Sequence, residues 1–330
     1  MIYKEIGNSG IECSVIALGA WAIGGGPFWG KTDDNESIRT INTALEAGIN
    51  LIDTAPGYGF GKSEEIIGQA IKGKRDKVVI STKCGLWWKD GRGTPKFELE
   101  GNKVNICLRP ETIKIEVEDS LRLLDTDYID ILHTHWQAVE PDKTPISETM
   151  NCLMELKKEG KIRAIAASNV TLEDVREYMK AGTLDAVQQK YSMLDRKLED
   201  ELLPYCRENQ IGVLVYSPLE QALLTGRFKK DTKLPADVYR NNIPWFKQGN
   251  RERVLDVLDS WEDLTEKYSC SLTRLVIAWT IAQTGITVAL CGARHPDQIL
   301  ENAGAAELAL DKADISRIRQ DITSLGDPVQ

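Results

Sequence analysis

Short apolar runs alternate with amphipathic segments along most of this chain, and this alternation restricts the possible folds more than any other feature. Eight apolar runs occur, at residues 15–18, 50–52, 78–82, 128–132, 162–166, 186–187, 212–216 and 287–290. Segments between them place apolar residues at i, i+3 and i+4, the spacing of one helix face; they include 37–47, 111–124, 146–159, 172–180 and 198–209. Strands that alternate with helices form right-handed βαβ units and a parallel sheet. Eight such units predict a closed α/β architecture, a single-domain (β/α)8 TIM barrel.

Two parts of the chain fall outside this repeat. Residues 3–6 and 11–15 flank Asn8-Ser9-Gly10, and they predict an N-terminal β-hairpin within residues 1–15 that closes the bottom of the barrel. Residues 83–107 and 219–249 are long connections containing Gly and Pro. Both leave the C-terminal ends of predicted strands, so we expect long βα loops over the C-terminal face. No linker interrupts residues 1–330, which predicts one domain.

Composition excludes several kinds of partner. The 50 acidic and 41 basic residues give a net charge of −9, and there is no basic stripe with interleaved aromatic residues, so we expect no nucleic acid partner. No run of about 18 uncharged apolar residues occurs, which predicts no membrane partner. The seven cysteines form no CxxC pair and no signal sequence begins the chain, which favours a cytoplasmic location. The three histidines have no i, i+4 spacing, so we expect no metal.

Four ionisable residues come just after predicted strands. Asp53, Lys83 and His135 each follow an apolar run, and Tyr58 lies in the turn after Asp53. The carboxyl ends of the strands of a parallel barrel meet on one face, where active sites form. Asp53 would keep Lys83 charged, the Lys83 ammonium would lower the pKa of Tyr58, and a neutral His135 would position a substrate oxygen. The set predicts carbonyl reduction, with Tyr58 as general acid and a nicotinamide as hydride source.

These residues and the sequence around them resemble the aldo-keto reductase family over essentially the whole chain. Matching segments are LGAWAIGG at 18–25, LIDTAPGYGFGKSEE at 51–65, STK at 81–83, RLLDTDYIDILHTHW at 122–136, GKIRAIAASN at 160–169, VQQKYSMLDR at 187–196, YSPLEQALLTGRF at 216–228 and ALCGARHPDQILEN at 289–302. The resemblance is to the bacterial branch related to general-stress reductases and potassium-channel β-subunits. It implies an oxidoreductase that binds NADPH without a Rossmann unit, and a catalytic tetrad of Asp53, Tyr58, Lys83 and His135. His133 competes with His135 for the last role, and the alignment of Thr134-His135-Trp136 favours His135.

The same resemblance implies a set of cofactor-binding residues. Ser168, Asn169 and Gln188 match the groups that bond the nicotinamide carboxamide, and Tyr216 matches the ring that stacks on the nicotinamide. The remaining members are Gly19, Ala20, Trp21 and Asp53, the pyrophosphate loop Ser217, Pro218, Leu219, Leu224, Gly226 and Arg227, and the adenosine end Gly292, Arg294, Gln298 and Asn302. A permanently charged guanidinium such as that of Arg294 suits a 2′-phosphate, so NADPH/NADP is favoured over NADH.

The chain departs from the pattern of that branch at a few positions. Gln137-Ala138 follows Trp136 where Pro-Asp is commoner, and Lys190 and Ser192 stand where Glu or Pro and Asn are commoner. Tryptophans are frequent in the predicted loops, and flat aromatic faces suit aromatic carbonyl compounds or sugar-like rings. We therefore expect these side chains to bind the substrate, a small-molecule carbonyl or alcohol: Trp29, Trp87, Trp88, Trp136 and Gln137.

Two other functions remain open at this stage. The chain could be a redox-sensing regulatory subunit that binds NADPH with little turnover. A desolvated Lys83 could instead form a Schiff base, as in an aldolase. The sequence does not distinguish a monomer from a homo-oligomer.

Overall fold

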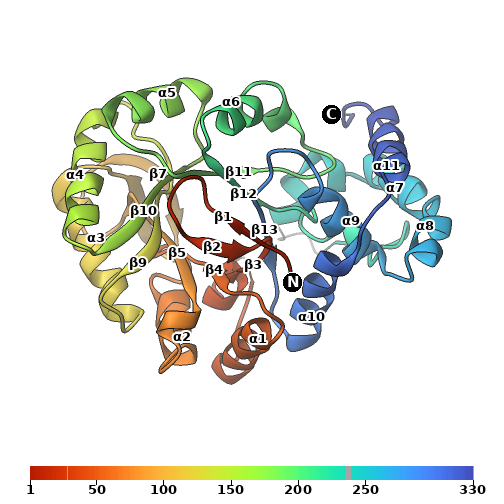
Figure 1. Cartoon of the computed structure of the whole chain (residues 1–330), viewed down its shortest axis with the longest axis horizontal. Helices are drawn as coiled ribbons and strands as arrows, with labels where there is room; N and C mark the ends of the chain where they lie inside the picture. Colours follow the sequence, from red (N-terminus) through yellow and green to blue (C-terminus); the bar gives the residue numbers. More distant parts are fainter. Residues whose placement is uncertain (28, 235–238, 330) are drawn as a thin grey trace.

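The computed structural model describes residues 1–27, 29–234 and 239–329, and its centre is a closed parallel barrel (Figure 1). Its strands are β3 (Ile16–Gly19), β4 (Leu51–Asp53), β5 (Val79–Cys84), β9 (Ile129–Thr134), β10 (Ile162–Ser168), β11 (Ala186–Lys190), β12 (Gly212–Tyr216) and β13 (Val288–Gly292). They pair in this order, and β13 pairs with β3 to close the ring. Each of the eight apolar runs overlaps one strand, so the prediction of a (β/α)8 barrel is confirmed.

Helices surround the barrel, and several begin at residues that satisfy free backbone N–H groups. They are α1 (Asp34–Glu46), α2 (Lys62–Ala70), α3 (Pro110–Leu123), α4 (Ile146–Lys158), α5 (Leu172–Ala181), α6 (Leu202–Glu208), α7 (Gln248–Asp259), α8 (Glu262–Lys267), α9 (Leu272–Ile281), α10 (Pro296–Gly304) and α11 (Lys312–Ser324). Thr171 and Asp174 form a capping box at α5, and Pro110 occupies the first turn of α3, where its missing N–H costs nothing. Helices α7, α8 and α11 lie together on one side (Figure 1).

One predicted helix is divided in two. The sequence predicts a helix over residues 198–209, but a 3-10 turn occupies Lys197–Glu199 and α6 begins only at Leu202. Pro204 lies in the first turn of α6. Proline has no N–H and is tolerated there but not further along a helix, so a helix containing Pro204 has to begin just before it.

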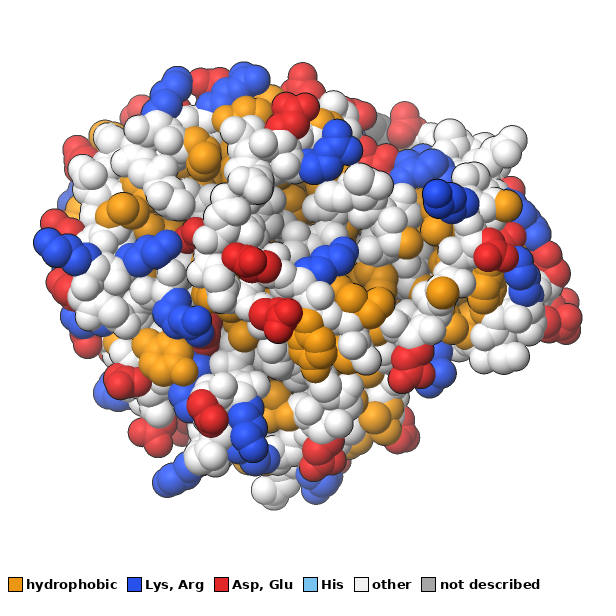
Figure 2. Space-filling view, viewed as in Figure 1, with side chains coloured by type: hydrophobic (Ala, Val, Ile, Leu, Met, Phe, Trp, Pro, Cys, Tyr) orange, Lys and Arg blue, Asp and Glu red, His pale blue; other side chains and the backbone are white. Residues whose placement is uncertain are grey.

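The predicted hairpin closes one end of the barrel. Strands β1 (Tyr3–Glu5) and β2 (Glu12–Ser14) pair antiparallel, and Ile6, Ile11 and Cys13 pack in one apolar cluster with the inward-facing side chains of the barrel strands. Figure 1 looks onto this end, with the hairpin across the middle of the barrel. The same face carries basic and acidic side chains interspersed with small apolar areas (Figure 2).

The connection over residues 83–107 is more ordered than the sequence analysis predicts. It contains a three-stranded antiparallel sheet of β6 (Leu86–Trp87), β8 (Asn102–Ile106) and β7 (Thr94–Leu99). Leu86, Val104 and Ile106 form a small separate core beneath it. The described parts of the connection over 219–249 instead contain 3-10 turns at Leu223–Thr225, Tyr239–Asn242 and Pro244–Phe246, and residues 235–238 lie outside the described chain. None of the described helices is long and apolar enough to span a bilayer.

Two carboxyl groups are buried between the barrel and its helices. The Thr82 hydroxyl donates a 2.7 Å hydrogen bond to Glu64, and the Gly85 amide donates a 2.8 Å bond to Glu116. Burial raises the pKa of Glu64 from 4.5 to about 7. Burial also raises the pKa of Glu116 well above its ordinary value. Both groups therefore favour the protonated, neutral form inside the folded protein.

We expect Glu64→Gln to stabilise the protein at pH 8 more than at pH 5. Because folding raises the pKa of Glu64 from 4.5 to about 7, its contribution to stability is complete below the unfolded pKa and is lost as the pH rises through the folded pKa. At 1.36 kcal/mol per pKa unit, the loss by pH 8 is roughly 3 kcal/mol. Glutamine has a similar shape and does not ionise, so the variant does not suffer this loss.

Urea unfolding at the two pH values measures this difference. Glu65→Gln is the matched control, because Glu65 is the next residue of α2 and its side chain is 49% exposed. An equal effect of Glu64→Gln at both pH values would contradict the prediction.

Candidate active site

A buried ion pair between Lys83 and Asp53 forms the floor of the candidate site. Asp53 ends β4 and Lys83 lies near the end of β5, and the parallel pairing of these strands brings both residues to one edge of the barrel. Lys83 Nζ lies 2.8 Å from Asp53 Oδ2 and donates a second bond of 2.7 Å to the Thr54 carbonyl. Lys83 is only 1% exposed, and a buried ammonium requires such a partner.

The other oxygen of Asp53 is also fully engaged. Asp53 Oδ1 accepts a 2.9 Å hydrogen bond from the Ser81 hydroxyl and a 2.7 Å bond from the Gln188 side-chain amide. The carboxylate thus joins β4, β5 and β11. Its orientation, and with it the position of the Lys83 ammonium, is fixed by three strands of the barrel.

Tyr58 reaches this floor on a tight turn after β4. The Lys83 Nζ lies 5.1 Å from the centre of the Tyr58 ring, and the His135 ring lies 6.1 Å from it. A Cβ added at Gly24 would lie 2.6 Å from the Tyr58 carbonyl, and one at Gly59, whose φ is +65°, would lie 2.2 Å from the Gly24 oxygen. Glycine is therefore required at both positions for the turn to approach the first loop so closely.

Burial and charge set the protonation of these groups. Burial raises the pKa of Tyr58 above its ordinary value of 10.0, although the Lys83 ammonium acts in the opposite direction. The sequence-based expectation of a lowered pKa is therefore wrong in sign, because it counted the charge and not the burial. Burial disfavours the charged form of Lys83, but Asp53 and Tyr58 together outweigh it and the pKa of Lys83 is raised. Burial, with Lys83, lowers the pKa of His135 well below 6.5, so its ring is neutral.

The two neighbouring histidines occupy different places. His133 is fully buried inside the barrel, with its Nε2 3.0 Å from the Ser81 hydroxyl. His135 follows β9 and lines the cavity described next. Only His135 is therefore placed to meet a ligand, as the sequence alignment favours.

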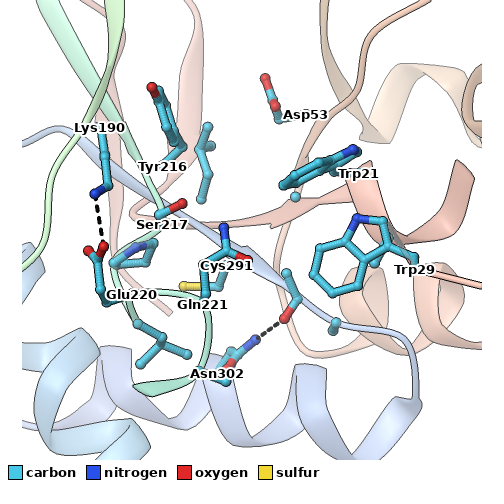
Figure 3. Close-up of a pocket in the computed structure, with 18 of the residues that line it drawn as sticks. Trp21, Trp29, Asp53, Lys190, Tyr216, Ser217, Glu220, Gln221, Cys291 and Asn302 are labelled. Carbon is cyan, nitrogen blue, oxygen red and sulfur yellow. Dashed lines mark hydrogen bonds and ion pairs between the residues drawn. The ribbon is translucent and has the colours of Figure 1, made fainter. Parts of the chain in front are cut away.

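A cavity of about 700 Å³ opens above the Lys83–Asp53 floor. Tyr58 and His135 line it, together with most residues of the expected cofactor set: Gly19, Trp21, Asp53, Ser168, Asn169, Gln188, Tyr216, Ser217, Pro218, Leu219, Arg227, Gly292, Arg294, Gln298 and Asn302. Figure 3 shows Trp21 and Trp29 facing Lys190 and Glu220 across it. Ala20, Leu224 and Gly226 do not line the cavity, and Ala20 and Leu224 are fully buried.

Hydrogen bonds fix the polar side chains at the deeper end of the cavity. The Asn169 side-chain amide donates a 2.9 Å bond to the His135 carbonyl, and its oxygen accepts a 2.8 Å bond from the Tyr216 hydroxyl. The Ser168 hydroxyl donates to the Gln188 carbonyl at 3.0 Å. These side chains therefore present a fixed polar surface beside the Tyr216 ring.

The charges in the cavity wall favour an anionic ligand. Three carboxylates lie among the described residues of the wall, and each is paired with a cation: Asp53 with Lys83 at 2.8 Å, Glu220 with Lys190 at 2.8 Å and Glu301 with Arg274 at 3.1 Å. Three arginines, at positions 227, 240 and 294, also line the wall, and none has a carboxylate partner within the part of the chain that the structure describes. A chain with net charge −9 therefore has a locally positive cavity.

Several wall residues were not among the sequence-based candidates. Arg240 lies in the long connection after β12 and donates to the Gln221 carbonyl. Glu301 lies on α10 between the expected Gln298 and Asn302. Lys190 ends β11 and faces Glu220, which lies in the loop after β12. The departure from the family pattern at Lys190 was the only signal in the sequence.

Three of the five expected substrate residues do not line the cavity. Trp87 is 2% exposed and its indole N–H donates to Asp90 at 2.6 Å, so it anchors the three-stranded sheet. Trp88 packs on Phe60, with the ring centres 5.1 Å apart. Gln137 donates to Thr134 and to the Ser168 carbonyl, both at 3.1 Å, and accepts from Tyr178.

The other two expected residues, Trp29 and Trp136, do line the cavity, together with Trp21. The Trp21 and Trp29 rings meet edge to face at 5.3 Å. Lys96 of β7 lies 3.8 Å from the Trp136 ring, so the three-stranded sheet supports this wall from outside.

Comparisons with known proteins agree with this fold. The model of the Aldo/keto reductase family matches residues 15–322. An NADH-specific methylglyoxal reductase of Escherichia coli is 47% identical over 317 residues, which cover 96% of each chain. The structure of a glycerol dehydrogenase of Gluconobacter oxydans superposes with a TM-score of 0.88 at 38% identity, covering 99% of this chain and 97% of that one. An aldo/keto reductase of Klebsiella pneumoniae, solved in complex with NADP and acetate, gives a TM-score of 0.70 at 25% identity, covering 97% and 94%.

The barrel, the cavity at its carboxyl end and these matches define an oxidoreductase that uses a nicotinamide cofactor. The chain belongs to the aldo/keto reductase family.

Proposed function

We propose that this protein reduces an aldehyde or ketone to an alcohol, with Tyr58 as the general acid. The observation that carries this proposal is the buried Lys83–Asp53 pair beneath Tyr58 and His135 at the floor of a cavity. A bound reduced nicotinamide would supply the hydride. The substrate carbonyl would lie against Tyr58 and His135, where a neutral His135 can donate a hydrogen bond to its oxygen.

Proton transfer then follows from the charges on the floor. The raised pKa of Tyr58 keeps its hydroxyl protonated at neutral pH, so the proton is available when negative charge develops on the substrate oxygen. As the Tyr58 O–H bond breaks, the proton moves to that oxygen, and the Lys83 ammonium stabilises the phenolate that remains. Asp53 acts through Lys83, because it holds the ammonium at 2.8 Å.

The wall fits a dinucleotide with its nicotinamide over the floor. Tyr216 would stack on the nicotinamide ring, and Ser168, Asn169 and Gln188 would bond its carboxamide. Arg227 and the loop Ser217–Leu219 would meet the pyrophosphate, for which unpaired guanidinium groups are suited. Gly292, Gln298 and Asn302 would surround the adenosine.

Arg294 would distinguish the two forms of the cofactor. Its guanidinium donates to the Lys31 carbonyl at 3.4 Å and has no acidic partner in the described chain, so we propose that it binds the 2′-phosphate of NADPH. NADH is the second candidate, and the name of the relative from Escherichia coli favours it.

The three indoles of the cavity suit a substrate with a flat or ring-shaped body. Trp21, Trp29 and Trp136 would contact an aryl aldehyde or the C–H face of a sugar-like ring. The names of two relatives favour a second class, short polar carbonyl compounds and polyols. A panel of aldehydes from three-carbon to aryl, with turnover compared in Trp136→Ala, separates the classes. Turnover of the short compounds alone would exclude the ring-shaped class.

Tyr58→Phe should reduce kcat by about a thousandfold or more, because it removes the proton donor and keeps the ring. The affinity for the cofactor, measured by fluorescence titration, should change by less than about threefold. Tyr3→Phe is the matched control, since it removes a hydroxyl of the hairpin, which donates to the Gly48 carbonyl after α1. Turnover by Tyr58→Phe at the native rate would exclude Tyr58 as the acid. A native chain that turns over no carbonyl compound at all would favour the sensing-subunit alternative.

Arg294→Ala should raise the KM for NADPH by about tenfold or more and leave the KM for NADH within about threefold, because only NADPH has the 2′-phosphate. Steady-state kinetics with both cofactors measure the two values. Arg122→Ala is the control, since this α3 side chain is 68% exposed. Equal changes for both cofactors would remove Arg294 from cofactor selection.

A further inference from the structure

The side chain of Glu220 places a carboxylate in the wall of the cofactor cavity. Glu220 lies four residues after Tyr216, in the loop that follows β12, and it lines the cavity with Ser217 and Gln221. It is 1% exposed. An acidic side chain in this position is unexpected, because the cavity is suited to a ligand with two phosphate groups.

Two residues of the neighbouring segment hold this carboxylate. Lys190 Nζ lies 2.8 Å from Glu220 Oε1, and the Ser192 hydroxyl donates a 2.7 Å hydrogen bond to Oε2 (Figure 3 shows the ion pair). Lys190 ends β11 and pairs in register with Tyr216 of β12. Lys190 also lies 3.3 Å from Asp195. We name Lys190, Ser192 and Glu220 the 190–220 clasp.

The loop holds Glu220 at the wall independently of Lys190. The Glu220 amide donates to the Ser217 carbonyl at 2.9 Å, and the Glu220 carbonyl accepts from Leu223 at 3.0 Å. Glu220, Gln221 and Ala222 all have left-handed φ values, of 44°, 54° and 72°. Three consecutive residues without glycine adopt this conformation only when the surrounding structure imposes it. Removal of the Lys190 charge therefore leaves the carboxylate in place, still bonded to Ser192.

The electrostatic consequence depends on Lys190. A buried carboxylate beside a phosphate group repels it strongly, because little water lies between them. When Lys190 is present, the Lys190–Glu220 pair has no net charge and does not repel the ligand in this way. Burial opposes the charged form of Lys190, but Glu220 and then Asp195 outweigh it, and the pKa of Lys190 is raised. The ammonium is therefore present throughout the neutral pH range.

We propose that Lys190 is a positioning residue for the cofactor. It neutralises the charge of Glu220, so that the loop Ser217–Ala222 can accept the pyrophosphate. This inference rests on the proposed function, since it requires that a dinucleotide occupy the cavity. It assigns a role to two departures of this chain from the family pattern, Lys190 and Ser192, that act on one carboxylate.

The test is a set of four variants whose affinity for NADH and NADPH is measured by titration of tryptophan fluorescence. Lys190→Met should raise the Kd by about tenfold or more, because it leaves an unpaired carboxylate in the wall. Glu220→Gln should leave the Kd unchanged or lower it. The double variant should return to within about threefold of the native value, since it removes both charges. Lys190→Arg should retain native affinity.

The control is Lys114→Met, which makes the same change of charge at an exposed ion pair between α3 and α4, where Lys114 meets Glu155. Thermal unfolding without cofactor identifies the temperature at which every variant is folded. If Glu220→Gln weakens binding as much as Lys190→Met, or if the double variant is not restored, the clasp has only a structural role and the proposal is wrong. If the native chain binds neither dinucleotide, the proposed function itself fails, and the proposal fails with it.

Discussion

The buried ion pair between Lys83 and Asp53 is the constraint on which the rest of the site depends. An ammonium that is 1% exposed is stable only if its partner is close and the remaining donors and acceptors are satisfied. Here the Thr54 carbonyl satisfies the ammonium, and Ser81 and Gln188 satisfy the carboxylate. Because these groups come from separate strands, the pair forms only when the barrel closes in one register. The geometry of the candidate site is thereby a property of the closed barrel.

Charge compensation extends from this floor along the whole cavity. Among the residues that the structure describes, each carboxylate of the wall has its own cation, and three arginines have no carboxylate partner. The overall charge of the chain is negative, so attraction for an anionic cofactor comes from local groups and not from a global field. The arrangement separates structural cations, which neutralise the wall, from those that can bind phosphate.

The sequence predicts the barrel well because buried parallel strands are continuous apolar runs of limited length, a signal that does not depend on distant residues. It misses the sheet of β6, β7 and β8, since only Leu86, Val104 and Ile106 give it an apolar core. Which tryptophans line the cavity depends on the direction in which each side chain points, which the sequence does not give: Trp136 lines the cavity and Trp87 does not. To predict that the pKa of Tyr58 is raised, one has to know that its side chain is buried. To predict the contact of Lys190 with Glu220, one has to know that β11 pairs with β12. Both depend on residues that are distant from each other in the sequence.

The pH dependence of turnover tests the central claim, that a protonated Tyr58 above a permanently charged Lys83 donates the proton. The rate of carbonyl reduction at saturating cofactor and substrate would be measured in parallel with the rate of alcohol oxidation. With the pKa of Tyr58 above 10.0 and that of His135 well below 6.5, reduction should be constant from about pH 7 to about pH 9, and oxidation should rise throughout that range. A reduction rate that falls with an apparent pKa near 7 would show that another group supplies the proton.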